Sequence, residues 1–186
     1  ATRRSFAAAW ARARGGSAGA LIVDHGLRPE SADEAAWALD LAENCGCASA
    51  ILRWAPPNGA GQAAARAARY ALLGAACAER GILHLLTAHH AEDCAETTAM
   101  RLVRDDSVFA AAGIEACSAT PWGRVLRPVL NWPSAPLRAN AADTPTVDDP
   151  SNRALRFERV RVRAAAGALA DAGFDRSALT ALAAQA

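Results

Sequence analysis

Two periods of apolar spacing alternate along the first hundred residues. Segments with helical spacing lie at 5–14, 31–44, 62–80 and 92–104. Between them lie three predicted strands. The run at 18–24 is almost continuously apolar, the pattern of a strand covered on both faces, and shorter strands are predicted at 50–54 and 82–88. This alternation predicts an α/β fold, with a Rossmann-like parallel sheet and helices on both of its faces.

Cap and turn residues set the ends of the predicted elements. Ser31 and Glu34 have the spacing of a capping box at a helix start. Gly81 follows the third helix, where glycine readily takes a left-handed C-terminal conformation. Beyond residue 105 we expect short strands and shorter helices, at 114–119, 125–130, 134–142, 155–172 and from 177.

Composition narrows the class of protein. No apolar run reaches the roughly 18 residues of a membrane span and no signal peptide is visible, so we expect a cytoplasmic protein. The five cysteines lack the spacing of metal or redox pairs. All 20 basic residues are arginine, which excludes Walker-type and Schiff-base chemistry. Because the net charge is only +1, a nucleic acid would have to bind a local basic patch.

Two segments of the first half place ligand-binding residue types at the ends of predicted elements. His25 and Gly26 follow the first strand, at the sheet edge where α/β proteins bind ligands. Arg66 and Arg69 are three residues apart on an alanine-rich helix and can point cations at a phosphate. The plain alternatives are a strand-exit turn and a solvated helix face.

The segment TAHHAEDCAET at 87–97 has the highest density of ionisable side chains. His89 and His90 precede a predicted helix, and Asp93 and Glu96 share one face of it. Paired carboxylates can hold a divalent metal or an ammonium group. The plain alternative is a capped helix start with solvated acids.

A fourth segment, at 147–163, contains five arginines. If the helix runs through this segment, Arg156, Arg159 and Arg163 lie on one face. Clustered arginine is typical of phosphate or RNA binding. The alternative is a helix whose arginines pair with neighbouring acids.

Taken in order, these segments resemble the N-terminal catalytic domain of the tRNA(Ile)-lysidine synthetase family of PP-loop ATPases. The matching stretches are VDHGLRPES, GQAAARAARY, TAHHAEDCAET, RLVR, RVLRPVL, VDDPSN and RFERVRVR. The resemblance spans roughly residues 5–170. It implies a catalytic domain over 1–165 and a linker helix over 166–186.

The resemblance implies a ligase that uses ATP and Mg²⁺. The family adenylates the wobble cytidine of tRNA(Ile) with a CAU anticodon, and the ε-amine of free L-lysine then attacks C2 and releases AMP. No membrane partner is expected, and a homodimer is an expected assembly.

The resemblance also assigns roles to residues of this chain. Asp93 and Glu96 match the catalytic carboxylates, and Asp93 also matches the magnesium ligand. His25, Gly26 and His89 match the surroundings of ATP. The residues expected on the side of the tRNA substrate are Arg66, Arg69, Asp149, Asn152, Arg159, Arg161 and Arg163.

Several positions depart from the family pattern. The phosphate loop SGGxDS is absent from the 186 residues, and the family's DDQ reads Glu92-Asp93-Cys94. We therefore expect the first strand and the PP-loop to be missing, and the chain alone to be inactive. A fragment of an active enzyme and a degenerate gene copy both explain these departures.

Two other functions stay open. One is a metal-dependent phosphoesterase that uses a set of histidines and aspartates suited to Mn²⁺ or Zn²⁺. Its candidate ligands are Asp24, His25, His89, His90, Asp93, Asp148 and Asp149. The other is a non-catalytic RNA-binding remnant, which would bind tRNA through the arginines of 153–163.

Overall fold

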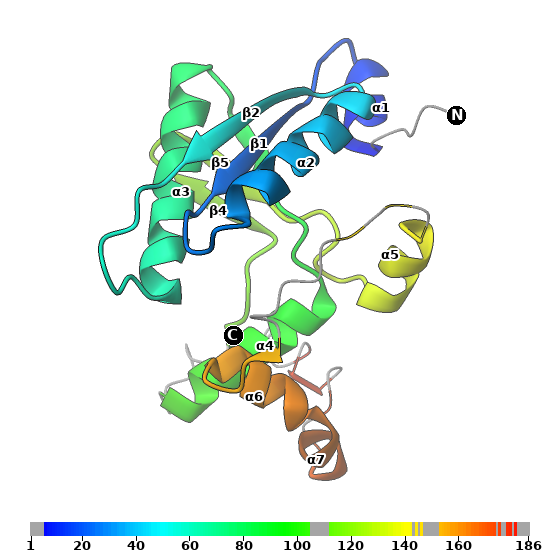
Figure 1. Ribbon diagram of the computed structural model, residues 1–186. Coiled ribbons are helices and arrows are strands. Elements are labelled where there is room, and N and C mark those ends of the chain that lie inside the picture. Colours follow the sequence, from blue (N-terminus) through cyan, green and yellow to red (C-terminus); the bar gives the residue numbers. More distant parts are fainter. Residues whose placement is uncertain are drawn as a thin grey trace. The chain divides into compact units, whose positions relative to one another are not determined.

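The chain divides into two compact units, residues 1–82 and 83–186, and each has its own sheet (Figure 1). The computed structural model describes residues 6–104, 112–142, 144, 146, 153–173, 175, 178, 179 and 181. Within these residues, no helix combines the length and the apolar character that a membrane crossing requires.

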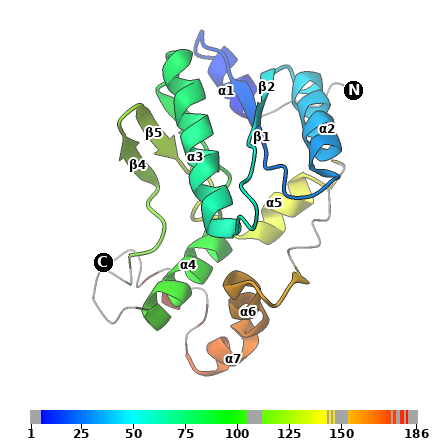
Figure 2. The ribbon, with the colours of Figure 1, turned by 60° about the vertical axis from the view of Figure 1, so that its left-hand side comes forward.

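Unit 1 is a two-stranded parallel sheet with a helix on each face (Figure 2). Its elements are α1 (Phe6–Arg12), β1 (Gly19–Asp24), α2 (Ser31–Asn44), β2 (Ala48–Arg53) and α3 (Gln62–Glu79). The strands pair over their whole length, from Gly19 opposite Ala48 to Asp24 opposite Arg53. Since the strands are parallel, their carboxyl ends meet at one edge, and the loops that follow them lie together there.

The core of unit 1 is built mainly from small side chains. Its buried apolar residues are Ala8, Ala35, Ala65, Leu73, Ala76 and Cys77. Burying one methyl group contributes about 0.8 kcal/mol, against roughly 1.5–3 kcal/mol for a leucine or phenylalanine. The backbone hydrogen bonds between β1 and β2 are therefore expected to contribute a large part of the stability of this unit.

Unit 2 holds a mixed three-stranded sheet in the order β3-β5-β4. Its elements are β3 (His84–Leu86), α4 (Ala91–Arg104), β4 (Cys117–Thr120), β5 (Gly123–Leu126), α5 (Ser134–Asn140), α6 (Glu158–Ala164) and α7 (Ala166–Asp171). β3 runs parallel to β5, whereas β4 and β5 form an antiparallel hairpin. Val125 of β5 is almost fully buried, so the central strand anchors this sheet.

The predicted α/β fold, with parallel strand pairs and helices on both faces of a sheet, is confirmed. The strand predicted over 82–88 is present but shorter than expected, and it is not buried. β3 has only three residues, and Leu86 is 49% exposed. Among the described residues β3 pairs with β5 alone, so one of its edges lacks a neighbouring strand.

Two helix predictions also need correction. Glu30 is the N-cap of α2, with no side-chain cap bond, so Ser31 and Glu34 do not form a capping box. Instead Ser31 hydrogen-bonds Asp24, and Glu34 pairs with Arg28. These bonds involve charged partners and are stronger than a neutral cap.

The helix predicted over 155–172 is two helices, α6 and α7, which are separated at Ala165. Arg156 precedes α6 and lies over the ring of Phe157, with 4.8 Å from its guanidinium carbon to the ring centroid. It therefore does not share a helical face with Arg159 and Arg163, as the sequence pattern indicated. The helix expected from 177 lies largely outside the described residues.

Among the described glycines of unit 2 for which the surroundings of an added Cβ are known, Gly123 leaves the least room for a side chain. Its φ is +154°, and a Cβ there would stand 2.5 Å from the carbonyl oxygen of Leu83. That oxygen cannot retreat freely, because it accepts the backbone N–H of Arg124 at 2.8 Å. We expect Gly123→Ala to lower the free energy of unfolding by about 2–4 kcal/mol in chemical denaturation.

Gly167→Ala is the matched control for this prediction. Gly167 lies in α7 with no heavy atom within 4 Å of the added Cβ. Alanine is a better helix former than glycine, so this variant should match or exceed the wild type in stability. Equal stability of the Gly123→Ala variant and the wild type would contradict the close approach of β5 to Leu83.

Candidate functional site

The carboxyl edge of the sheet in unit 1 is organised around Asp24. This side chain is buried, and its Oδ1 accepts the backbone N–H of Gly26 at 3.0 Å. That bond, followed by the bond from Ser31, lowers the pKa of Asp24 below its usual value. Gly26 has a φ of +58°, and a Cβ there would lie 3.1 Å from the Trp54 carbonyl oxygen. Gly26 thus lets the loop after β1 approach the loop after β2.

His25 lies at the same edge and accepts two hydrogen bonds from Arg69 of α3. The Nε and Nη2 atoms of Arg69 stand 3.1 Å and 2.8 Å from His25 Nε2. The ring also makes an edge contact with Trp54, at 6.3 Å between centroids. Because Nε2 accepts, the neutral ring carries its proton on Nδ1, a buried atom with no hydrogen-bond partner in the described part of the chain.

Burial, and then the charge of Arg69, lower the pKa of His25 below its usual 6.5. The imidazole is therefore neutral at physiological pH, with one N–H available as a donor. Arg66, the other arginine predicted here, does not join this cluster. It lies over the ring of Tyr70, 5.2 Å from the centroid.

The first turn of α4 forms the corresponding cluster in unit 2. Asp93 Oδ2 accepts the backbone N–H of His90 at 3.1 Å, the bond that an acidic side chain in the first turn makes back to the residue before the helix. The His90 ring stands between two acids, with Nδ1 3.0 Å from Glu92 Oε2 and Nε2 3.5 Å from Asp93 Oδ2. His89 Nδ1 lies 2.9 Å from the hydroxyl of Thr87.

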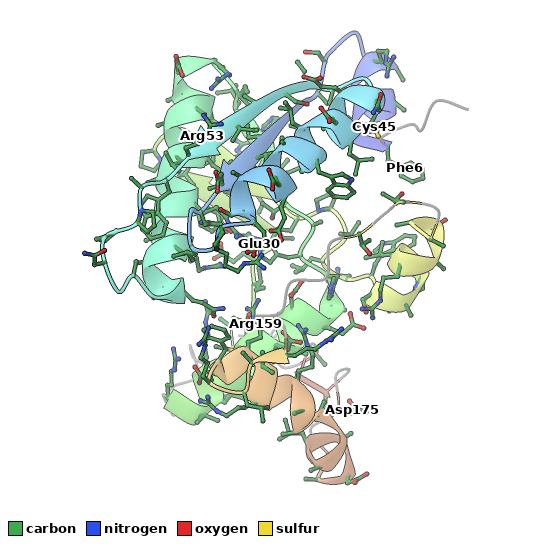
Figure 3. The ribbon with its side chains drawn as sticks, viewed as in Figure 1. Phe6, Glu30, Cys45, Arg53, Arg159 and Asp175 are labelled. Atoms are coloured by element: carbon green, nitrogen blue, oxygen red, sulfur yellow. The ribbon has the colours of Figure 1, made fainter. Side chains whose placement is uncertain are left out.

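Glu96, one turn further along α4, meets α6. Its side chain is only 9% exposed, and it forms a two-point ion pair with Arg163: Nε to Oε1 at 2.7 Å and Nη2 to Oε2 at 3.1 Å. The hydrogen bond to Glu96 raises the pKa of Arg163 above its usual value. Arg159 also lies at this seam, where Figure 3 labels it beside α4.

A pocket of about 380 Å³ opens beside this cluster, within unit 2. Its polar lining comes from His90, Glu92, Glu96, Ser134, Arg138 and Arg163. Its apolar wall comes from Ala95, Ala99, Val162, Ala166, Leu169 and Leu179. The volume is at the lower end of the range of small-molecule sites, and the formal charges of its two acids and two arginines cancel.

Ser134 and Arg138 are pocket residues that the sequence did not reveal. The backbone N–H of Ser134, at the start of α5, donates to Glu92 Oε2 at 2.9 Å. Arg138 donates to the Ser134 hydroxyl at 2.6 Å. Their i, i+4 spacing was readable, but nothing in the sequence linked that helix face to Glu92, 42 residues earlier.

The remaining predicted residues are distributed as follows. Arg161 donates to the carbonyl oxygens of Leu155 and Arg156, at 3.0 Å and 3.1 Å, and so supports its own chain. Asp149 and Asn152 lie outside the described residues. The structure therefore brings Asp93 and Glu96 together with Arg159 and Arg163, and His25 together with Arg69.

The described residues do not fit a resident metal ion. No group of three or more His, Cys, Asp or Glu side chains among them could hold one. Asp93, the predicted magnesium ligand, has Oδ2 occupied by the His90 N–H and Oδ1 3.7 Å from Arg159 Nη1. The phosphoesterase alternative thus lacks a metal centre in the described part; its candidates Asp148 and Asp149 lie outside that part.

The lowered pKa of His25 predicts a pH-dependent stability of unit 1. The unfolded chain takes up a proton near pH 6.5, whereas the folded ring resists protonation until a lower pH. Its contribution is therefore fully present above pH 6.5 and is lost as the pH falls toward the lowered pKa. We expect the melting temperature of the wild type to fall more between pH 7 and pH 5.5 than that of His25→Gln.

Arg66→Gln is the control for this pH series, because it removes a cation from the same helix without touching His25. It should keep the pH dependence of the wild type. Identical slopes for the wild type and His25→Gln would contradict a lowered pKa of His25, whether from burial or from the charge of Arg69.

Comparison with known proteins identifies the family of the chain. Residues 4–168 match the family model of the PP-loop domain. The chain is 45% identical over 165 residues to the tRNA(Ile)-lysidine synthase of Novosphingobium aromaticivorans, which covers 84% of this chain and 51% of that protein. It is 41% identical over 186 residues to the synthase of Bradyrhizobium diazoefficiens, covering 97% and 52%. The chain thus spans about half the length of these relatives.

A solved structure shows the same fold at low sequence identity. The U34-tRNA thiolase NcsA from Methanococcus maripaludis, with its 4Fe-4S cluster, superposes with a TM-score of 0.67 at 16% identity. The match covers 87% of this chain and 60% of that one. At this identity the likeness shows the fold alone. With the family match over residues 4–168, it follows that the chain belongs to the PP-loop domain family.

Proposed function

We propose that this chain supplies the lysine-binding part of a tRNA(Ile)-lysidine synthetase, an ATP-dependent ligase that joins lysine to C2 of the wobble cytidine. The observation that carries the proposal is the pocket of unit 2, whose lining combines carboxylates and guanidiniums with apolar side chains. Similarity to lysidine synthases over most of the chain supports it. The cytoplasmic location and the homodimer belong to the same proposal.

Free L-lysine complements this pocket along its length. Its two ammonium groups suit Glu92 and Glu96, and its α-carboxylate suits the guanidinium of Arg138. Its four methylene groups suit the wall made by Ala95, Ala99, Val162, Ala166, Leu169 and Leu179. Because the pocket holds both acids and arginines, it offers a partner of opposite charge to the ammonium groups and to the carboxylate of this ligand.

The proposed reaction has two steps. The C2 oxygen of the cytidine attacks the α-phosphorus of ATP, and pyrophosphate leaves. The lysine ε-amine then attacks C2, and the bond between C2 and oxygen breaks, so that AMP leaves with the electron pair. The amine must lose a proton, and Asp93 beside Glu96 is the proposed acceptor, since an ionised carboxylate can act as a general base.

The nucleotide is assigned to residues that lie at strand ends. In unit 1 the Nδ1–H of His25 has no partner among the described residues and suits an acceptor on adenine or ribose. Gly26 is the other proposed contact of unit 1. For unit 2, considered by itself, an ATP contact at His89 is proposed from the family resemblance alone. Arg66, Arg69, Asp149, Asn152 and Arg161 remain proposed contacts on the tRNA side. Mg²⁺ stays an expectation of the family, and no step is derived through it.

The phosphate loop matters for the adenylation step of the proposed reaction. The 186 residues contain no SGGxDS motif, whose backbone N–H groups would cradle the pyrophosphate. The proposal is therefore that the 186-residue chain binds lysine but does not adenylate tRNA by itself.

Lysine binding is the direct test. Isothermal titration of the chain with L-lysine should show one site, and Glu96→Gln should weaken it roughly tenfold or more, because a charge-assisted contact is lost. Glu158→Gln is the matched control. Glu158 pairs with Arg104 between the same two helices, but it does not line the pocket. A wild-type chain without affinity for lysine would overturn the proposal.

The second test is an assay with tRNA(Ile), ATP and lysine. We expect no AMP release and no lysidine from the 186-residue chain, as measured by nucleoside mass spectrometry. Formation of lysidine by this chain alone would show that the activation step does not need the missing loop.

A further inference from the structure

The seam between α4 and α6 holds four charged side chains in an alternating arrangement. Asp93 and Glu96 are three residues apart on α4, and Arg159 and Arg163 are four apart on α6. Arg163 binds both oxygens of Glu96, as described above. Arg159 reaches three groups: Thr97 Oγ1 at 3.1 Å from Nη2, Asp93 Oδ1 at 3.7 Å from Nη1, and Glu96 Oε2 at 3.5 Å from Nε.

The two arginines offset the repulsion between the carboxylates of Asp93 and Glu96 on α4. Two carboxylates three residues apart on a helix repel each other, and Glu96 is also buried, so its charge needs partners within the protein. The two guanidiniums cancel both charges and bond the buried oxygens. Buried ions are tolerated when they are paired and hydrogen-bonded in this way.

The pairing leaves part of Glu96 available to a ligand. A carboxylate has about four acceptor sites, and the described bonds use one on Oε1 and up to two on Oε2. Arg163 and Glu96 both line the 380 Å³ pocket. Arg163 therefore sets the direction in which the remaining lone pair of Glu96 points.

The structure assigns Arg163 and Arg159 a role different from phosphate binding. Resting on the proposed function, we infer that they are positioning residues: Arg163 orients the Glu96 carboxylate at the lysine pocket, and Arg159 bridges Glu96 and Asp93 on α4. Arg161, between them in sequence, bonds only backbone carbonyls among the described residues. The arginine run at 153–163 thus contains members with different tasks.

The test measures two affinities of the same folded chain. The first is the ratio of dissociation constants for norleucine and lysine, which differ at the ε-ammonium group. The second is the slope of log K against log salt for tRNA binding. If a variant only loosens the packing, the affinities for lysine and for norleucine fall together and their ratio does not change. A change in the ratio therefore reports the contact between the carboxylates and the ε-ammonium group.

Arg163→Gln should reduce the preference for lysine over norleucine roughly tenfold, because Glu96 loses both oriented bonds. Arg163→Lys should restore part of it, since lysine keeps the charge but not the two-point geometry. The salt slope for tRNA should stay unchanged in both variants. Arg124→Gln is the charge-matched control: Arg124 is exposed on β5 of the same unit and does not line the pocket.

Three outcomes separate the possibilities. A salt slope about one unit shallower in Arg163→Gln, with the lysine preference kept, would make Arg163 a phosphate ligand and overturn the inference. An unchanged lysine preference together with an unchanged slope would overturn it as well. A wild-type chain that binds no lysine would overturn the proposed function, and the inference with it.

Discussion

The packing of α6 against α4 in unit 2 depends on one buried carboxylate, that of Glu96. Glu96 is 7% exposed as a residue, and a charge in that position requires partners that bond both of its oxygens. Arg163 and Arg159 supply them from α6, a helix of seven residues with no buried residue of its own. The apolar side chains of such a helix are at most half-buried, so the ion pairs, with the Arg104 pair to Glu158, add to what holds it against α4. The same contacts define one wall of the pocket.

The first unit depends on a different constraint. Its core is largely alanine, and the shape of its ligand edge follows from the parallel pairing of β1 with β2. Parallel pairing brings the loop after Asp24 against the loop after Arg53, and Gly26 permits the approach to Trp54. His25 is then held between Trp54 and Arg69, neutral and with one donor free of protein partners among the described residues. The polar residues at this edge of the sheet are thus fixed in place although the core of the unit consists mainly of small side chains.

Much of the fold and part of the candidate site could be predicted from local pattern. The helices over 31–44, 62–80 and 92–104 and the strands over 18–24 and 50–54 differ from the observed elements by two residues or fewer at each end. Helical periodicity also placed Asp93 and Glu96 on one face. The failures have physical causes: Ser31 and Glu34 found charged partners in place of a cap, and β3 lacks a second neighbouring strand among the described residues.

The sequence by itself determined the order of strands and helices, the spacing of Asp93 and Glu96, and the motif order that identifies the family. All of these depend on residues close together in the chain, where backbone geometry sets the spacing. The tertiary structure alone decided that Arg163 binds Glu96, 67 residues away, that Arg69 binds His25, and that Ser134 and Arg138 join the pocket. Contacts of this kind depend on how helices pack. From the sequence alone, many of the arginines in this chain could have paired with Glu96. Packing selected among them, because a buried acid is stable only beside the guanidinium that reaches both of its oxygens.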